Sequence, residues 1–154
     1  PKGRSSLSCS FSILFCYLDC LDLVLIRPRP PTFLIDVVYA TPRNFMGESV
    51  YDAPLIALVP EAFDALEKAH SLMKKEGYGF LLLDGYRPLH VQQKMWDRIQ
   101  DERFVSNPQK MGGRHTRGTA IDLTLIDLEG KEVEMPTPFD AFTEKAAYAF
   151  QDLP

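Results

Sequence analysis

One short segment, residues 119–126, limits the possible folds of this chain more than any other. Its residues alternate between apolar types and small or polar types, so they predict a half-buried strand. Ile121, Leu123 and Leu125 then share one face, which we expect to lie in the core. Asp122 lies on the opposite face, where a carboxylate is costly unless it is paired or binds a metal ion. The segment therefore predicts both a sheet and a polar site on it.

The other signals mix helices and strands without a regular repeat. Pro60 suits the first position of a helix, and Lys74, Lys75 and Gly77 suit the end of the same helix. Strands are expected at residues 33–40, 79–84 and 119–126, and helices at residues 60–76, 88–100 and 139–151. This mixed order favours an α+β fold over a doubly wound sheet.

The composition is that of an ordinary globular protein. The chain has 154 residues, of which 45% are hydrophobic, and this is enough for one domain with a core. The net charge of -4 gives no electrostatic basis for binding nucleic acid or an anionic membrane. We therefore expect no nucleic-acid partner, no stable membrane association, and a small or polar binding partner.

The first thirty residues differ from the rest. All three cysteines lie at positions 9, 16 and 20, so no disulfide can form from residue 33 onward, and a reducing compartment is compatible with the sequence. The apolar run at residues 11–26 resembles a signal peptide superficially, but Asp19 and Asp22 interrupt it. We expect a cytoplasmic location, with a periplasmic or secreted one as the alternative if the run is a signal.

The segment Arg27-Pro28-Arg29-Pro30-Pro31 predicts a stiff, extended linker. We place a domain boundary there. Residues 1–32 are then an extension outside the folded part, and residues 33–154 form the domain.

Two pairs of residues are candidates for chemistry. His115 precedes the expected strand of Asp122 across a turn at Gly118, and both side chains are competent zinc ligands. Judged locally, a hydrogen-bonded pair is the commoner arrangement and a metal site is the alternative. Arg87 follows a strand end, where it either pairs with Asp84 or presents a fixed positive charge that stabilises an oxyanion.

Two further residues have ordinary local interpretations. Asp140 fits an N-cap or first-turn acid of the last expected helix. Tyr39, at the end of the first expected strand, fits a half-buried aromatic residue.

Taken together, these residues resemble a known family. His115-Thr-Arg-Gly118-Thr-Ala120-Ile-Asp122 is similar to the HxxGxAxD zinc signature of the D-Ala-D-Ala metallopeptidases, which include the vancomycin-resistance dipeptidases, the zinc D,D-carboxypeptidases and the hedgehog signalling domain. Further motifs in the order and approximate spacing of the dipeptidase branch narrow the resemblance to that branch. They are Tyr39-Ala-Thr41 with Asn44-Phe-x-Gly47, Asp84-Gly-Tyr-Arg-Pro88, Ala120-Ile-Asp-Leu-Thr-Leu125 and Phe139-Asp140.

The resemblance implies a fold, a cofactor and a reaction. The fold would be a small central, mainly antiparallel sheet packed with helices, and the cofactor would be Zn²⁺ with His115 and Asp122 as two of its three protein ligands. Arg87 matches the arginine that steadies the tetrahedral intermediate. Tyr39 and Asp140 match positions that hold the free ammonium group of the substrate. The implied function is zinc-dependent hydrolysis of the dipeptide D-Ala-D-Ala, a component of peptidoglycan chemistry in the cell wall.

The sequence also departs from the family pattern. The family places its catalytic base and third zinc ligand in a later Glu-x-x-His segment, whereas the only such pattern here is Glu67-Lys-Ala-His70, which we interpret as a surface coincidence. We therefore expect an incomplete C-terminal part and little activity of this chain alone. Gly113 stands where the family commonly has serine. The alternatives are a non-catalytic relative that keeps the fold for binding, and a zinc D,D-carboxypeptidase that acts on wall peptides.

Overall fold

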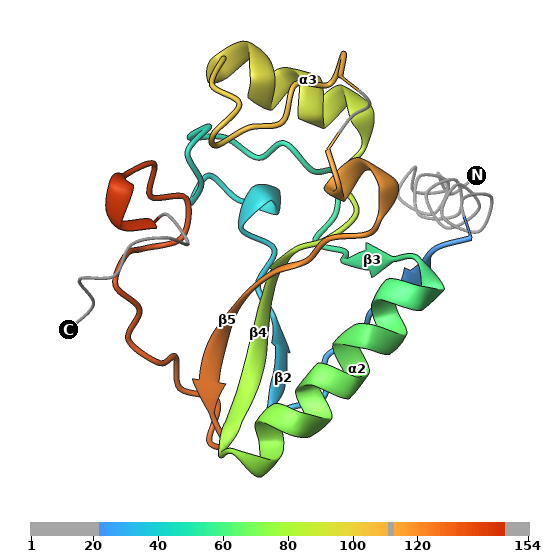
Figure 1. Cartoon of the computed structure of the whole chain (residues 1–154), viewed down its shortest axis with the longest axis vertical. Helices are drawn as coiled ribbons and strands as arrows, with labels where there is room; N and C mark the ends of the chain where they lie inside the picture. Colours follow the sequence, from blue (N-terminus) through green and yellow to red (C-terminus); the bar gives the residue numbers. More distant parts are fainter. Residues whose placement is uncertain (1–21, 111–112, 147–154) are drawn as a thin grey trace, which may run out of the picture.

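A three-stranded sheet forms the centre of the computed structural model, which describes residues 22–110 and 113–146 (Figure 1). Its strand order is β2-β4-β5, with β2 parallel and β5 antiparallel to β4. A two-stranded antiparallel sheet joins β1 and β3. The strands are β1 (Val24–Leu25), β2 (Phe33–Ile35), β3 (Ala57–Leu58), β4 (Tyr78–Asp84) and β5 (Asp122–Asp127).

Two α-helices lie in different places around the sheet. The helix α2 (Pro60–Lys75) runs beside the sheet, and α3 (Leu89–Arg98) lies beyond one end of it (Figure 1). Three short 3-10 turns complete the described elements: η1 (Val38–Ala40), η2 (His115–Arg117) and η3 (Glu144–Ala146). The structure confirms the α+β class with mainly antiparallel pairing. Over the described ranges, no helix has the length and apolar character that crossing a membrane requires.

The helix α2 begins and ends where its local sequence predicts. Pro60 occupies the start, Glu61 lies in the first turn, and Lys74 and Lys75 lie in the last turn. These charges complement the partial charges at the two helix ends. Gly77 follows with a φ of 89°, a left-handed conformation that glycine adopts at little cost and that ends the helix.

The strand β4 is buried on both faces, which explains its continuous apolar sequence. Phe80 and Leu82 pack into one core cluster together with Leu66 of α2. Leu81 and Leu83 point to the opposite face and pack into a second cluster with Met95 of α3. The central strand therefore packs into both core clusters. Its C-terminal residue, Asp84, has no exposed surface.

Three of the expected elements differ from the structure, and the strand expected at 119–126 begins only at Asp122. The expected strand at 33–40 ends at Ile35 and continues as η1, which turns Tyr39 toward the interior. The helix expected at 139–151 does not begin at Phe139: Asp140 has a φ of 60°, and within the described residues that follow it the one helical element is the 3-10 turn η3. Phe139 packs on Tyr39, and this tertiary contact accompanies the loop conformation. The end of that expected helix, at residues 147–151, lies outside the described residues.

The expected domain boundary near residue 32 falls inside packed structure. The strand β1 pairs with β3, with Val24 opposite Leu58 and Leu25 opposite Ala57. Ile26 donates its backbone N–H to Ile56 and is only 4% exposed. The segment before the proline-rich stretch thus pairs in a sheet and places Ile26 in the core, whereas the expectation for residues 1–21 lies outside the described range.

Candidate metal and substrate site

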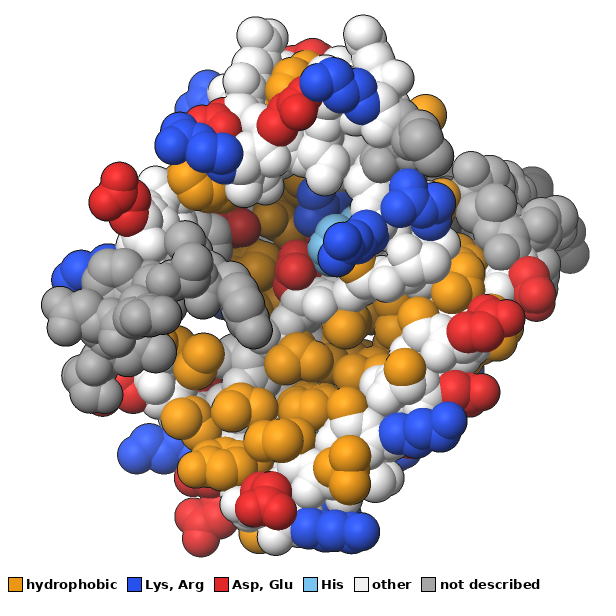
Figure 2. Space-filling view, in the orientation of Figure 1, with side chains coloured by type: hydrophobic (Ala, Val, Ile, Leu, Met, Phe, Trp, Pro, Cys, Tyr) orange, Lys and Arg blue, Asp and Glu red, His pale blue; other side chains and the backbone are white. Residues whose placement is uncertain are grey.

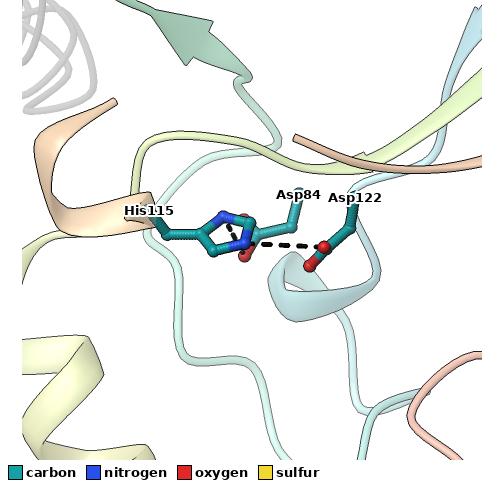
Figure 3. Close-up of side chains that lie close together, drawn as sticks. All are labelled: Asp84, His115 and Asp122. Carbon is teal, nitrogen blue, oxygen red and sulfur yellow. Dashed lines mark ion pairs between the residues drawn. The ribbon is translucent and has the colours of Figure 1, made fainter. Parts of the chain in front are cut away.

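The candidate site lies at the end of the sheet where two carboxylates meet. Asp84 ends β4 and Asp122 begins β5, and the antiparallel register pairs these two residues directly. His115 reaches the same point from η2, and ligand atoms of the three side chains lie within 4.8 Å of one another (Figure 3). Figure 2 shows a hollow between α3 and the sheet in which acidic, basic and histidine side chains gather. This arrangement concentrates charge in a recess.

A glycine turn places His115 against the start of β5. Gly118 has a φ of 67°, and a Cβ at this position would lie 2.8 Å from the Leu23 side chain, so only glycine fits without displacing it. The backbone is further fixed because Arg87 donates its N–H to the carbonyl oxygen of His115 at 3.1 Å. His115 and Asp122, seven positions apart in the sequence, are thereby brought to one point.

The imidazole of His115 is oriented as a ligand that uses Nε2. Its Nδ1 lies 2.8 Å from the carbonyl oxygen of Gly85, which can only accept, so Nδ1 carries the hydrogen and Nε2 presents a lone pair. Burial alone lowers the pKa of His115, but the neighbouring Asp122 carboxylate outweighs burial and raises the pKa overall. A metal ion at Nε2 would take the place of the proton that Nε2 gains when the imidazole becomes charged.

The spacing of His115 and Asp122 fits two ligands of one metal ion. The Nε2 of His115 lies 3.5 Å from Oδ1 of Asp122, longer than the 2.7–3.2 Å expected of a hydrogen bond. Two tetrahedral zinc ligands at about 2.0–2.1 Å from the metal are roughly 3.3 Å apart, close to the observed separation. The Asp122 side chain is 35% exposed and can therefore reach an ion that enters from solvent.

Asp84 lies close to His115, but its hydrogen bonds go to other groups. Its Oδ1 accepts hydrogen bonds from the Tyr51 hydroxyl at 2.7 Å and the Gly85 N–H at 2.9 Å. Its Oδ2 accepts from Nε and Nη2 of Arg87 at 3.2 and 2.6 Å. Four donors thus occupy a carboxylate with no exposed surface, so we assign Asp84 to the arginine rather than to the metal position.

Arg87 is a buried cation held in place by its neighbours. Its exposed fraction is 8%, and its ion pair with Asp84 is also buried. Burial alone lowers the pKa of Arg87, but the Asp84 carboxylate more than offsets burial, so the guanidinium stays charged. The Cζ atom lies 5.2 Å from the centroid of the Tyr39 ring, within the range of a cation–π contact.

Tyr39 connects Arg87 to Asp140. Its hydroxyl donates to Oδ1 of Asp140 at 2.8 Å across 101 positions of sequence. The other oxygen, Oδ2, is buried and has no hydrogen-bond partner. Burial raises the pKa of Asp140. An unsatisfied buried carboxylate oxygen is costly, so its placement is consistent with a ligand that supplies the missing donor.

The structure brings all five residues singled out in the sequence into one connected group. Contacts run from Asp122 to His115, on to Asp84 and Arg87, and from Arg87 through Tyr39 to Asp140. Asp84 pairs with Arg87, as the local interpretation of that motif expected. Two members of the group, Tyr51 and Gln92, were missed because their roles depend only on tertiary contacts.

The isolated Glu-x-x-His pattern is not part of this group. Glu67 forms an ion pair with Arg29. His70 bonds through Nε2 to the carbonyl oxygen of Thr32 at 2.8 Å, and its ring packs against Phe33. The expectation of a surface position is wrong for His70, which is 7% exposed. It is a histidine of the core that fixes α2 to the chain before β2.

An α+β domain that presents a histidine nitrogen and a carboxylate beside a buried arginine has the features of a metal-dependent hydrolase centre. The family model described as D-Ala-D-Ala dipeptidase, of peptidase family M15, matches residues 21–153. The chain therefore belongs to the D-Ala-D-Ala dipeptidase family.

Curated relatives support the same assignment. The chain is 33% identical to a D-alanyl-D-alanine dipeptidase of Escherichia coli over 128 residues, which is 83% of this chain and 66% of the relative. It is 33% identical to the enzyme of that name from Enterococcus faecium over 134 residues, covering 74% of this chain and 66% of the relative. The match to the Enterococcus faecalis enzyme is 32% over 138 residues. The chain spans about two thirds of the length of these relatives.

Proposed function

We propose that this chain contains the metal-binding and substrate-binding part of a zinc-dependent D-Ala-D-Ala dipeptidase. The observation that carries the proposal is the 3.5 Å separation of His115 Nε2 and Asp122 Oδ1, which suits two ligands of one zinc ion. The connected group of Arg87, Tyr39 and Asp140 lies beside this pair. It offers a cation for the oxyanion and a carboxylate for the ammonium group of a dipeptide. Family membership and the names of the relatives supply the substrate.

The donor set suits zinc. A neutral imidazole and a carboxylate are both zinc ligands, and catalytic zinc sites take three protein ligands and leave one position for water or substrate. His115 and Asp122 supply two of the three. The family resemblance assigns the third ligand and the base to a Glu-x-x-His segment, a role that the core residue His70 does not fit. Zinc, when bound, acidifies a water molecule and polarises the scissile carbonyl group.

The roles of the remaining residues follow from their charge and burial. Arg87 presents a fixed positive charge that stabilises the oxyanion formed when water attacks the peptide carbonyl. Asp140 and Tyr39 receive the free ammonium group, because Oδ2 of Asp140 is a buried acceptor that lacks a donor. A substrate without a free amino group would leave that oxygen unsatisfied and would be rejected. This selection explains a preference for a dipeptide over an internal peptide bond.

Binding of the dipeptide tests the proposal. We expect the zinc-loaded chain to bind D-Ala-D-Ala in isothermal titration calorimetry and to bind N-acetyl-D-Ala-D-Ala at least tenfold more weakly. Asp140→Asn should weaken binding of the free dipeptide by about tenfold or more, since it removes the charge that meets the ammonium group. Equal affinity for the two ligands, or an unaffected Asp140→Asn variant, would refute the assigned roles.

Turnover separates the enzyme from the non-catalytic alternative. Release of D-alanine from D-Ala-D-Ala, abolished by a chelator, is the result for a dipeptidase. If the natural protein binds D-Ala-D-Ala but releases no D-alanine, this result would favour a relative that keeps the fold only for binding. We propose a cytoplasmic location, which the lack of cysteine in residues 33–154 accommodates.

A further inference from the structure

Gln92 is a buried amide that contacts the functional arginine directly. It lies on α3 and is 1% exposed. Its Oε1 accepts a hydrogen bond from Nη1 of Arg87 at 3.0 Å. Its Nε2 donates to the carbonyl oxygen of Ser106 at 2.7 Å. Both ends of the amide are therefore engaged by groups from different segments of the chain.

These two partners fix the orientation of the Gln92 amide. The guanidinium of Arg87 can only donate, and the carbonyl oxygen of Ser106 can only accept. A flipped amide would place its NH₂ group against the cation and its oxygen against a carbonyl oxygen, and both contacts would be repulsive. The side chain thus has one favourable orientation, in which its oxygen faces Arg87.

Gln92 and Asp84 hold the guanidinium from different sides. Asp84 accepts from Nε and Nη2, and Gln92 accepts from Nη1. Because the guanidinium is planar, contacts at all three nitrogens restrict both its position and its rotation. Each terminal nitrogen carries a second hydrogen beyond these contacts, and its direction is set by them.

Gln92 also lies next to the segment that leads to His115. A Cβ atom added to Gly113 would lie 3.3 Å from Cβ of Ser106 and 3.6 Å from Oε1 of Gln92. The chain before the metal-binding histidine therefore passes close to this amide. Gln92 connects three parts of the site: Arg87, the backbone at Ser106, and the approach to His115.

We propose that Gln92 is a positioning residue for Arg87, which aims the remaining N–H groups of the guanidinium at the substrate oxyanion. The inference rests on the proposed function in one respect, the oxyanion that Arg87 receives. The positioning itself rests on contacts within this chain and can be tested without a substrate.

The first test measures the guanidinium directly. We expect slow rotation of the Arg87 Nη groups in ¹⁵N-resolved NMR spectra of the unliganded chain, because both terminal nitrogens are held. Gln92→Met keeps the approximate size of the side chain and removes both of its hydrogen bonds, so the Nη1 signals should broaden or merge. Gln93→Met is the matched control, because Gln93 lies on the same helix and bonds instead to Asp97 at 2.8 Å.

The second test measures the consequence for binding. The probe is the phosphinate analogue of D-Ala-D-Ala, whose tetrahedral anionic centre mimics the oxyanion, and it is compared with D-Ala-D-Ala itself on the zinc-loaded chain. Gln92→Met should weaken binding of the phosphinate by about tenfold and change binding of the dipeptide by less than about twofold. Gln93→Met, the same control as in the first test, should leave the affinity for both ligands unchanged.

The outcomes separate this inference from the proposed function. Unchanged Arg87 signals in Gln92→Met would overturn the inference, as would equal weakening of the binding of both ligands. If the signals change as expected but the wild-type chain does not bind the phosphinate, the positioning stands and the proposed role of Arg87 fails.

Discussion

Replacing Asp84 with asparagine should destabilise the folded chain by about 3–5 kcal/mol, because it leaves the buried guanidinium of Arg87 without a counter-charge. The asparagine has nearly the same shape, so the loss reflects charge rather than packing. Its NH₂ group would also oppose a donor, whether it faces Arg87 or the backbone N–H of Gly85, which now donates to Asp84 at 2.9 Å. Unfolding by urea, followed by circular dichroism, measures the change in free energy.

A surface pair of the same chemistry provides the control. Asp36 pairs with Arg43 at 2.6 Å, and these side chains are 38% and 60% exposed. Asp36→Asn should therefore change the free energy of unfolding by less than about 1 kcal/mol. If Asp84→Asn is as mild as Asp36→Asn, then the buried pair does not contribute as its burial and geometry indicate.

The second large effect concerns metal binding. His115→Ala should remove bound zinc from the purified chain, because it deletes one of the two ligands that we propose, the one whose ring is oriented by Gly85. The variant should remain folded, since the His115 side chain is partly exposed and its removal leaves no buried charge without a partner. Zinc content per chain after dialysis, measured by elemental analysis, gives the result.

His90→Ala is the matched control for this experiment. His90 is an exposed histidine on α3 and lies outside the connected group, so its removal should leave the zinc content unchanged. Zinc content that is the same in His115→Ala and in the wild-type chain would refute the proposed site. Loss of zinc in both variants would instead indicate binding to exposed histidines.

The elements that sequence reasoning located well are those with local causes. The helix α2 has its proline, its charged ends and its terminal glycine within one stretch, and β4 is a continuous apolar run because both of its faces are buried. The sequence pattern does not predict which distant segments pair with each other. The contact of β1 with β3 depends on the close approach of residues more than thirty positions apart, so Ile26 was not recognised as part of the core.

The residues of the site also divide into those that local sequence predicts and those that depend on tertiary contacts. The spacing of His115, Gly118 and Asp122 is local, and the glycine turn helps to bring the two proposed ligands together. Gln92 looks like any polar residue of a helix in the sequence, and its burial against Arg87 follows only from the packing of α3. Asp140 was expected at a helix start, but its contact with Tyr39 places it in a left-handed loop conformation.

The most direct test of the central claim is the position of zinc itself. Crystals of the zinc-loaded chain, measured on both sides of the zinc absorption edge, would locate the ion by anomalous scattering. We expect one ion about 2.0–2.2 Å from Nε2 of His115 and from a carboxylate oxygen of Asp122, outside the coordination distance of Asp84. An ion bound by Asp84, an ion at another place, or no ion would contradict the proposed site.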